Sequence, residues 1–197
     1  MKRLFLAALL TFCFVLHGYS QNFIQGVVDR LSFGVKAGGN YSNYVNTSFS
    51  TQALTGFHAG ALVDFRLTNH LAFQEEFLFS TQGAKVKGDV FGQENVRVNY
   101  LSVPLLFKYR TTLGLYVEAG MQVGVRLNEN VGGSGQGNFA KLLDQAAVGG
   151  LGYQSKMGLG VGVRYVAGFS KVGDLKDMGV SEDFRTSVAQ ASIFYIF

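Results

Sequence analysis

The sequence has one cysteine, one proline and no tryptophan among its 197 residues, and only 15% of the residues are charged. The single cysteine, Cys13, cannot form an internal disulfide, which excludes a disulfide scaffold. One proline excludes a collagen-like or proline-rich chain. Charged residues average about 25% in globular proteins, so this low share, with 48% apolar residues, excludes a disordered chain. The residues in excess are glycine (26) and Phe and Tyr (18 and 9), which favours an all-β fold.

The first twenty residues have the pattern of a secretory signal peptide. Lys2 and Arg3 precede an uncharged, apolar run over residues 4–16, and Gly18 and Ser20 are small residues at the positions that signal peptidase reads. The run is too short for a transmembrane helix. We therefore predict a signal peptide over 1–20 and a mature domain over 21–197, with 21–30 as a short periplasmic segment. Without Lys2 and Arg3 the net charge falls by two from +4, and the small surplus that remains gives no case for a nucleic-acid partner.

The mature chain alternates apolar and polar residues with a period of two, the pattern of β-strands. In residues 113–127 every odd position is apolar, while the even positions carry Gly, Tyr, Glu, Gln or Arg. The pattern predicts eight strands, over residues 31–40, 57–67, 71–81, 101–110, 113–127, 146–153, 157–169 and 192–197.

The lengths of the strands and of their connections indicate a membrane barrel. Several predicted strands have about eleven residues or more, whereas five or six is usual in soluble proteins and about nine to eleven cross a bilayer. Tight turns at 68–69, 111–112 and 155–156 alternate with longer polar stretches at 41–55, 83–95, 128–144 and 171–183. This layout predicts an eight-stranded antiparallel transmembrane β-barrel with short periplasmic turns and long outer loops. The alternative is a secreted soluble barrel or sandwich, whose second face would carry more charge.

Several segments resemble the PorT-type outer-membrane β-barrel family, often labelled porin-like. The resemblance covers most of the mature chain and is carried by residues 33–42 (FGVKAGGNYS), 73–85 (FQEEFLFSTQGAK), 99–109 (NYLSVPLLFKY), 114–124 (GLYVEAGMQVG) and 158–165 (GLGVGVRY). These motifs are structural, so the resemblance implies a fold and no shared activity. The chain departs from the family at Glu75, where proline is common. Parity places Glu75 on the lipid face, so we expect either a bulge there or a position near the interface.

Charged side chains on the inward face predict a polar network that fills the lumen. By parity the inward set is Lys36, Asp64, Glu76, Lys108, Glu118, Gln122, Arg126 and Arg164. An unpaired buried charge costs several kcal/mol, so these groups should pair across strands. We expect Glu118 and Arg164 at the centre, with Glu76 reaching in from the opposite wall and Arg126 reaching water. At the chain end, Tyr195 and Phe197 have the pattern of an assembly signal that the barrel-assembly machinery reads.

Other candidates for chemistry are few. His58 is expected at the outer rim, with Ser42, Ser48 and Ser50 nearby, but nothing in their spacing requires the contacts of a catalytic triad. The glycine run at 132–137 lacks the Lys-Ser/Thr sequel of a phosphate-binding loop. Gly158, Gly160 and Gly162 are interpreted as inward glycines that make room for large side chains. We predict no catalytic, cofactor or metal site.

The predicted function is that of an integral protein of the bacterial outer membrane with a filled lumen and a structural or interaction role through its outer loops. The alternatives are a barrel enzyme that acts on lipid or peptide at the outer rim, and a narrow porin-like channel. The expected partners are outer-membrane lipid and lipopolysaccharide, the barrel-assembly machinery during biogenesis, and envelope proteins that contact the loops.

The alternation of turns and loops predicts the orientation of the chain. Because the mature chain has no cysteine, single Ser134→Cys and Thr112→Cys variants give clean probes. A membrane-impermeant maleimide added to intact cells should label the first and spare the second. Both should react after the cells are lysed, and equal labelling in intact cells would contradict the orientation.

Overall fold

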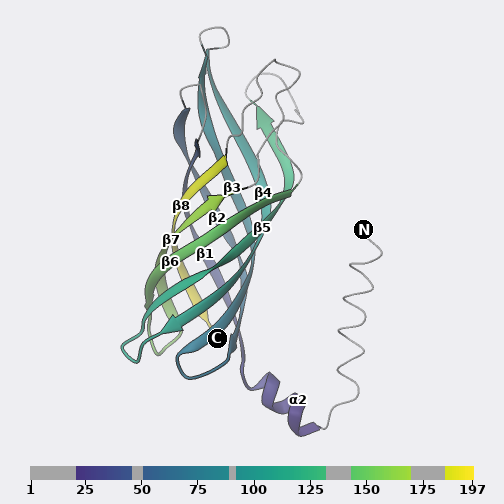
Figure 1. Cartoon of the computed structure of the whole chain (residues 1–197), viewed down its shortest axis with the longest axis vertical. Helices are drawn as coiled ribbons and strands as arrows, with labels where there is room; N and C mark the ends of the chain where they lie inside the picture. The colour runs from purple at the N-terminus through teal and green to yellow at the C-terminus, as the bar shows by residue number, and fades with distance from the viewer. Residues whose placement is uncertain (1–20, 46–50, 89–91, 132–142, 170–184) are drawn as a thin grey trace.

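The computed structural model describes residues 21–45, 51–88, 92–131, 143–169 and 185–197. Eight antiparallel strands form a closed barrel, so the predicted fold class is confirmed. The strands are β1 (Leu31–Val45), β2 (Thr51–Arg66), β3 (Leu71–Gly88), β4 (Gly92–Arg110), β5 (Leu115–Val131), β6 (Leu143–Gln154), β7 (Leu159–Gly168) and β8 (Arg185–Ile196). Figure 1 shows the strands tilted around the long axis of the molecule.

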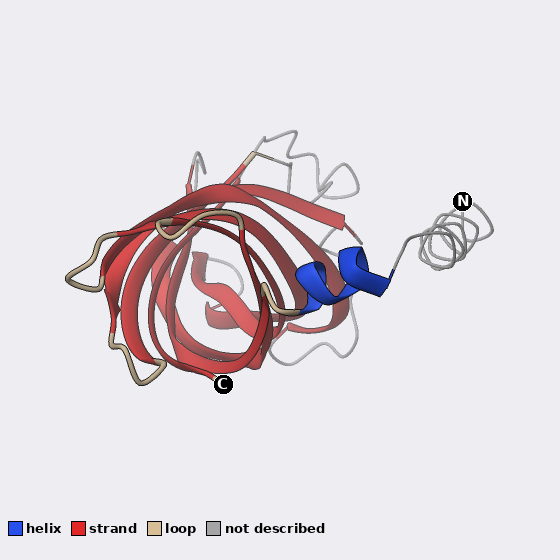
Figure 2. Ribbon diagram, turned by 90° about the horizontal axis from the view of Figure 1, so that it is seen from below, coloured by secondary structure: helices blue, strands red, loops and turns tan. Residues whose placement is uncertain are grey.

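The barrel closes because the first strand pairs with the last. β1 pairs with β2 on one side and with β8 on the other, where Val35 lies opposite Tyr195. Seen from below, the strands form a complete ring (Figure 2). A closed sheet has no edge with unpaired backbone groups, which is a requirement for crossing hydrocarbon.

Seven strands, all except β7, extend further toward the loop end than the sequence predicts. β3 continues to Gly88 and β4 begins at Gly92, so most of the predicted 83–95 loop is a paired hairpin. Likewise 41–45, 51–55 and 128–131 are strand. These extensions are rich in polar residues and lack a regular apolar alternation, yet their backbone pairing continues. The remaining loop residues, including the 132–137 glycine run, lie outside the described residues, as does the predicted signal peptide.

The three tight turns occur where they were predicted, each as a four-residue connection at 67–70, 111–114 or 155–158. Gly114 and Gly158 have φ angles of 94° and 89°, a conformation that residues with a side chain rarely adopt. Gly158 was expected inside a strand, and this prediction is wrong, because β7 begins only at Leu159. The strand predicted from residue 113 likewise begins later, at Leu115.

A short helix precedes the barrel, and strand patterns gave no indication of it. α2 covers Gln21–Val28 within the predicted N-terminal segment and lies beside the short-turn end of the barrel (Figures 1 and 2). Its exit is held by Arg66, whose side chain donates to the Asp29 carbonyl at 3.0 Å and whose backbone N–H donates to the Arg30 carbonyl at 2.9 Å. Among the described residues, no helix has the length and apolar character to cross a membrane.

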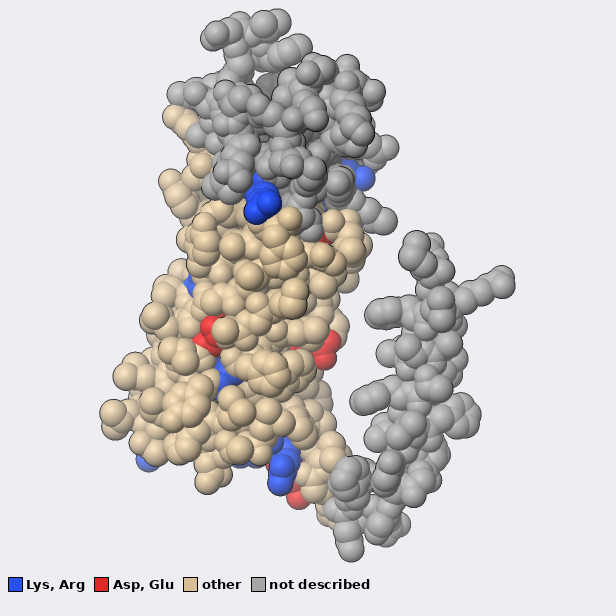
Figure 3. All heavy atoms as spheres, viewed as in Figure 1, with Lys and Arg blue, Asp and Glu red and all other residues tan. Residues whose placement is uncertain are grey.

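The outer wall is apolar, whereas the interior contains charged and polar groups beside smaller apolar clusters, such as that of Leu62, Tyr116 and Phe194. Outward side chains such as Phe33 and Phe107 are 59% and 56% exposed, whereas the inward Lys36 and Glu76 are 4% and 0% exposed. Uncharged residues cover most of the face drawn in Figure 3, with small acidic and basic patches between the rims. A soluble barrel would have the opposite arrangement, so the secreted soluble alternative does not agree with this structure.

Glu75 lies on the outer wall without any bulge. It pairs with Val63 on β2 and Leu105 on β4, and the β2–β3 register is unbroken from His58 to Arg66. The bulge explanation is therefore wrong. Glu75 is the fifth residue of β3, counted from the short-turn end, and its side chain is partly buried.

The final residue, Phe197, adds one more backbone hydrogen bond between the chain end and β1. Its N–H donates to the Phe33 carbonyl at 2.8 Å, while its side chain is 75% exposed and packs edge-on against Tyr195.

Deleting Phe197 should reduce assembly in cells more than folding in a test tube. If the end is an assembly signal, the heat-modifiable form in cell envelopes should fall several-fold, while urea-denatured protein should still refold into lipid vesicles. The control is Phe107→Ala, which removes another lipid-facing ring. An equal loss in the control would mean that apolar area, and not a terminal signal, determines assembly.

Candidate functional site: the charge network of the lumen

Seven predicted lumen residues point inward from six strands. All are nearly inaccessible, with exposed fractions of 0–7%, and they are Lys36, Asp64, Glu76, Lys108, Glu118, Gln122 and Arg164. The alternation of each strand sets this direction, since successive side chains point to opposite faces and the two sequence neighbours of each residue point outward. Arg126 is only partly buried, near the loop end of β5.

Arg164 is the centre of the network and holds two carboxylates. Its Nη1 and Nη2 donate to the two oxygens of Glu76 at 2.8 Å each, and its Nε donates to Glu118 Oε1 at 2.9 Å. Glu76 comes from β3 and Glu118 from β5, so one guanidinium on β7 links distant parts of the wall. Two-pronged arginine–carboxylate contacts of this kind are among the stronger hydrogen bonds in proteins.

Glu76 is the second centre. Besides Arg164 it accepts a hydrogen bond from Lys36 Nζ at 2.9 Å and one from the Gln74 amide at 2.6 Å. The other end of the Gln74 amide accepts from Lys108 Nζ at 3.1 Å. Lys108 also lies over the Tyr116 and Phe194 rings, at 4.2 and 4.6 Å from their centroids. The chain of contacts therefore runs from β1 through β3 to β4 and fills the middle of the barrel.

Inward glycines provide the room for these side chains. A methyl group at Gly150 would lie 2.8 Å from Arg164 Cβ and 2.9 Å from Glu118 Oε1. Gly160 faces the Phe194 ring, and Gly162 faces the Tyr116 hydroxyl. A larger residue at these positions would displace the network or the aromatic rings that pack against it.

The formal charges of the lumen network cancel. Lys36, Lys108 and Arg164 balance Asp64, Glu76 and Glu118. Within the described residues, Asp64 lies outside the hydrogen-bonded set, but it lines the same cavity as Lys108 at the short-turn end. Gln122 is also buried, on β5 four residues after Glu118, and within the described residues it has no hydrogen bond to the network.

His58 belongs to a second polar cluster, and its predicted position at the outer rim is wrong. It is 1% exposed, because β1 and β2 continue beyond it toward the loop end. Its Nδ1 lies 2.7 Å from Asn40 Oδ1 and its Nε2 lies 2.9 Å from Ser192 Oγ. Gln190 donates to the same Asn40 oxygen at 2.9 Å. Of the serines expected nearby, Ser42 bonds backbone carbonyls instead, and Ser48 and Ser50 lie outside the described residues.

The Ser192–His58–Asn40 contacts have the distances of a nucleophile, base and orienting group. Asn40 Oδ1 accepts from Gln190, so it is also the acceptor for His58 Nδ1–H, and Nε2 is left to accept from the serine. However, the His58 ring packs over Gly38 inside the filled lumen, which gives a substrate no path to it. The arrangement satisfies buried polar groups, which is a structural role. Among the described residues, no group of three His, Cys, Asp or Glu side chains could hold a metal ion.

Apolar outside, charged inside and closed by its terminal strands, the chain is an integral β-barrel of the bacterial outer membrane. The family model described as "Outer membrane protein beta-barrel domain" matches residues 19–174, so the chain belongs to this family. No functionally curated protein matches the sequence.

Solved structures give the same fold at low sequence identity. Neisserial surface protein A is 15% identical, with a TM-score of 0.54 over 84% of this chain and 97% of that one. Ail of Yersinia pestis is 14% identical, with a TM-score of 0.52 over 84% and 98%. OprG of Pseudomonas aeruginosa is 11% identical, with a TM-score of 0.50 over 84% and 95%. At these identities the likeness shows the fold alone.

Removing Arg164 should be strongly destabilising. Arg164→Ala leaves Glu76 and Glu118 buried with fewer positive partners, so the free energy of unfolding should fall by about 3–5 kcal/mol. Urea unfolding in lipid should be measured for the parent, Glu118→Ala, Arg164→Ala and the double variant. The exposed Arg185→Ala is the control and should stay within about 0.5 kcal/mol. Additive losses in the double variant would show that the two residues are not coupled.

Proposed function

We propose that this protein is a closed-lumen scaffold that acts through the surface it presents outside the membrane. The observation that carries the proposal is the Glu76–Arg164–Glu118 network, whose side chains are at most 3% exposed and lie across the middle of the barrel. A barrel of eight strands encloses just enough space for side chains. With that space occupied, we propose that contact with large partners involves the outer loops, the extended hairpin of β3 and β4, or the lipid-facing wall.

The structural neighbours give this proposal modest support. Ail is named for attachment and invasion, and one of its structures holds the heparin analogue sucrose octasulfate. Neisserial surface protein A is named for the cell surface. For this chain we propose contact of the same general kind, between outer loops and a molecule of the envelope or its surroundings.

Within the family, we propose a PorT-type barrel on the strength of the five resembling segments. Lipopolysaccharide around the outer wall and the barrel-assembly machinery at the β8 end complete the proposed set of partners. The removal of residues 1–20 as a signal peptide and a Gram-negative source are parts of the same proposal.

The two alternatives lose support for different reasons. A diffusion channel would need a continuous path, and the charge network lies across it. An enzyme at the outer rim would need an accessible histidine, and His58 is buried among Asn40, Gln190 and Ser192.

The closed lumen predicts no ion conduction. Purified protein reconstituted into planar lipid bilayers in 1 M KCl should show no discrete openings, because the charged side chains leave no continuous water path. Insertion should be verified by protease protection in the same lipid, and a sixteen-stranded porin serves as the conducting control. Discrete single-channel steps from the parent protein would contradict the proposal and favour the narrow channel.

A further inference from the structure

A cavity at the short-turn end of the barrel contains more positive than negative charge. It has a volume of about 270 Å³, just below the usual range of small-molecule sites, about 300–1,000 Å³. Its polar lining includes Asp64, Arg66, Lys108, Arg110 and Gln154. We call this cavity the turn-side mouth. In outer-membrane barrels the end with short turns faces the periplasm.

The two arginines of the mouth are the cations that the lumen network does not neutralise. The three bases and three acids of that network already balance, and Asp64 is counted among them. Arg66 uses one nitrogen to donate to the carbonyl of Asp29, which is an uncharged acceptor. Among the described residues, no carboxylate lies within ion-pair distance of Arg66 or Arg110. The mouth therefore has a surplus of two guanidinium groups.

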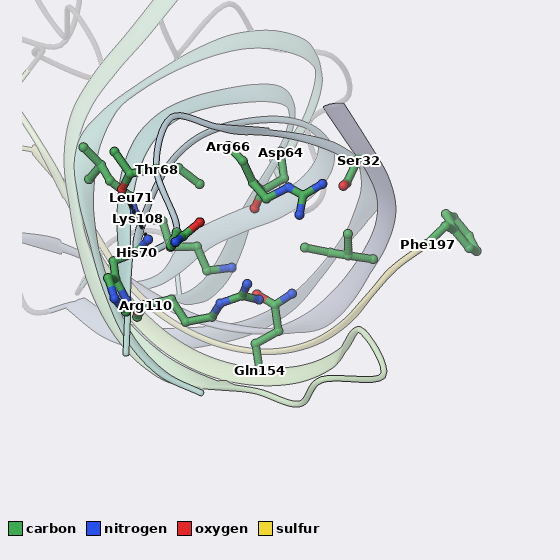
Figure 4. Close-up of a pocket in the computed structure, with 13 residues that line it drawn as sticks. Ser32, Asp64, Arg66, Thr68, His70, Leu71, Lys108, Arg110, Gln154 and Phe197 are labelled. Atoms are coloured by element: carbon green, nitrogen blue, oxygen red, sulfur yellow. Dashed lines mark hydrogen bonds between the residues drawn. The ribbon is translucent and has the colours of Figure 1, made fainter. Parts of the chain in front are cut away.

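The backbone positions of these arginines are fixed by the wall. Arg66 ends β2 and Arg110 ends β4, and both precede turns that hold the strand ends. The His70 ring lies 2.9 Å from the Arg110 carbonyl, and Arg66 N–H bonds the Arg30 carbonyl. Figure 4 shows Arg66, Lys108 and Arg110 around one opening, with Gln154 on the opposite wall. A bound group would meet donors from several strands.

We propose that the turn-side mouth binds an oxyanion, a phosphate or a carboxylate group. The planar fork of arginine matches the paired oxygens of these anions. Lys108 closes the inner end of the cavity as a buried ammonium, 2% exposed, with the Gln74 oxygen as its hydrogen-bond acceptor. The Gln154 amide supplies a neutral donor. The cavity has room for a phosphate-sized group. Its source is either an anion dissolved in the periplasm or the headgroup of an anionic phospholipid.

The test is a titration of the full mature chain in non-ionic detergent with inorganic phosphate, followed by backbone amide NMR. Saturable shifts should concentrate at residues 66–72, 108–114 and 154. In Arg66→Gln/Arg110→Gln the affinity should fall at least tenfold. The matched control is Arg30→Gln/Lys156→Gln, which removes two positive charges from the same end but outside the mouth. Its affinity should change less than twofold.

Two outcomes would overturn the proposal: no saturable binding to the parent, or equal weakening in the two double variants, which would indicate general surface charge. A second arm distinguishes the sources of the anion. If the affinity for free phosphate is lower in nanodiscs that contain phosphatidylglycerol than in phosphatidylcholine nanodiscs, the lipid headgroup competes for the site and is the ligand. Phosphate affinity equal to that in phosphatidylcholine nanodiscs would identify a dissolved anion.

Discussion

The contact between Glu76 and Arg164 is the interaction on which the interior of this barrel depends. Glu76 is fully inaccessible, and a carboxylate in that position persists only with cations and donors around it. Arg164 reaches it from the opposite wall, and this reach requires small residues along the way, such as Gly150. Lys36, Gln74 and Glu118 then complete the coordination of the two central groups. The filled lumen, the absence of an open path and the glycine-rich β6 and β7 are parts of one arrangement.

The fold was accessible from the sequence because membrane and lumen impose opposite demands on alternate residues. Lipid requires an apolar side chain at every second position, whereas the lumen takes charged, polar, small and some large apolar side chains at the others. That constraint is strict along residues 113–127 and 157–169, where the predicted strands are nearly right. The inward direction of Glu118 and Arg164 follows from the same parity, and opposite charge on glycine-rich strands indicated which residues would meet.

The constraint disappears outside the hydrocarbon, and the predictions become less accurate there. Residues 83–95 have the polar composition of a loop. β3 and β4 nevertheless continue through most of them, because backbone pairing alone maintains a hairpin. The burial of His58 followed from the similar extension of β1 and β2 and was missed for the same reason. Its partners Asn40, Gln190 and Ser192 come from β1 and β8, whose pairing depends on closure. Uncharged polar residues on distant strands carry no sequence signal that would connect them.

The strands differ in length, and this makes the outer rim oblique. β4 has 19 residues and β7 has ten, a difference of roughly 30 Å in contour length at about 3.3 Å per residue. About nine to eleven residues suffice to cross the bilayer. β7 is therefore just long enough to cross it, whereas β4 continues beyond it. Because tight turns align the strands at the other end, the additional residues of β3 and β4 all lie on the loop side, where they form a raised wall (Figure 1). In the part of the chain that the structure describes, the paired strands therefore reach higher over β3 and β4 than over β7, so the strand wall is asymmetric in the plane of the membrane.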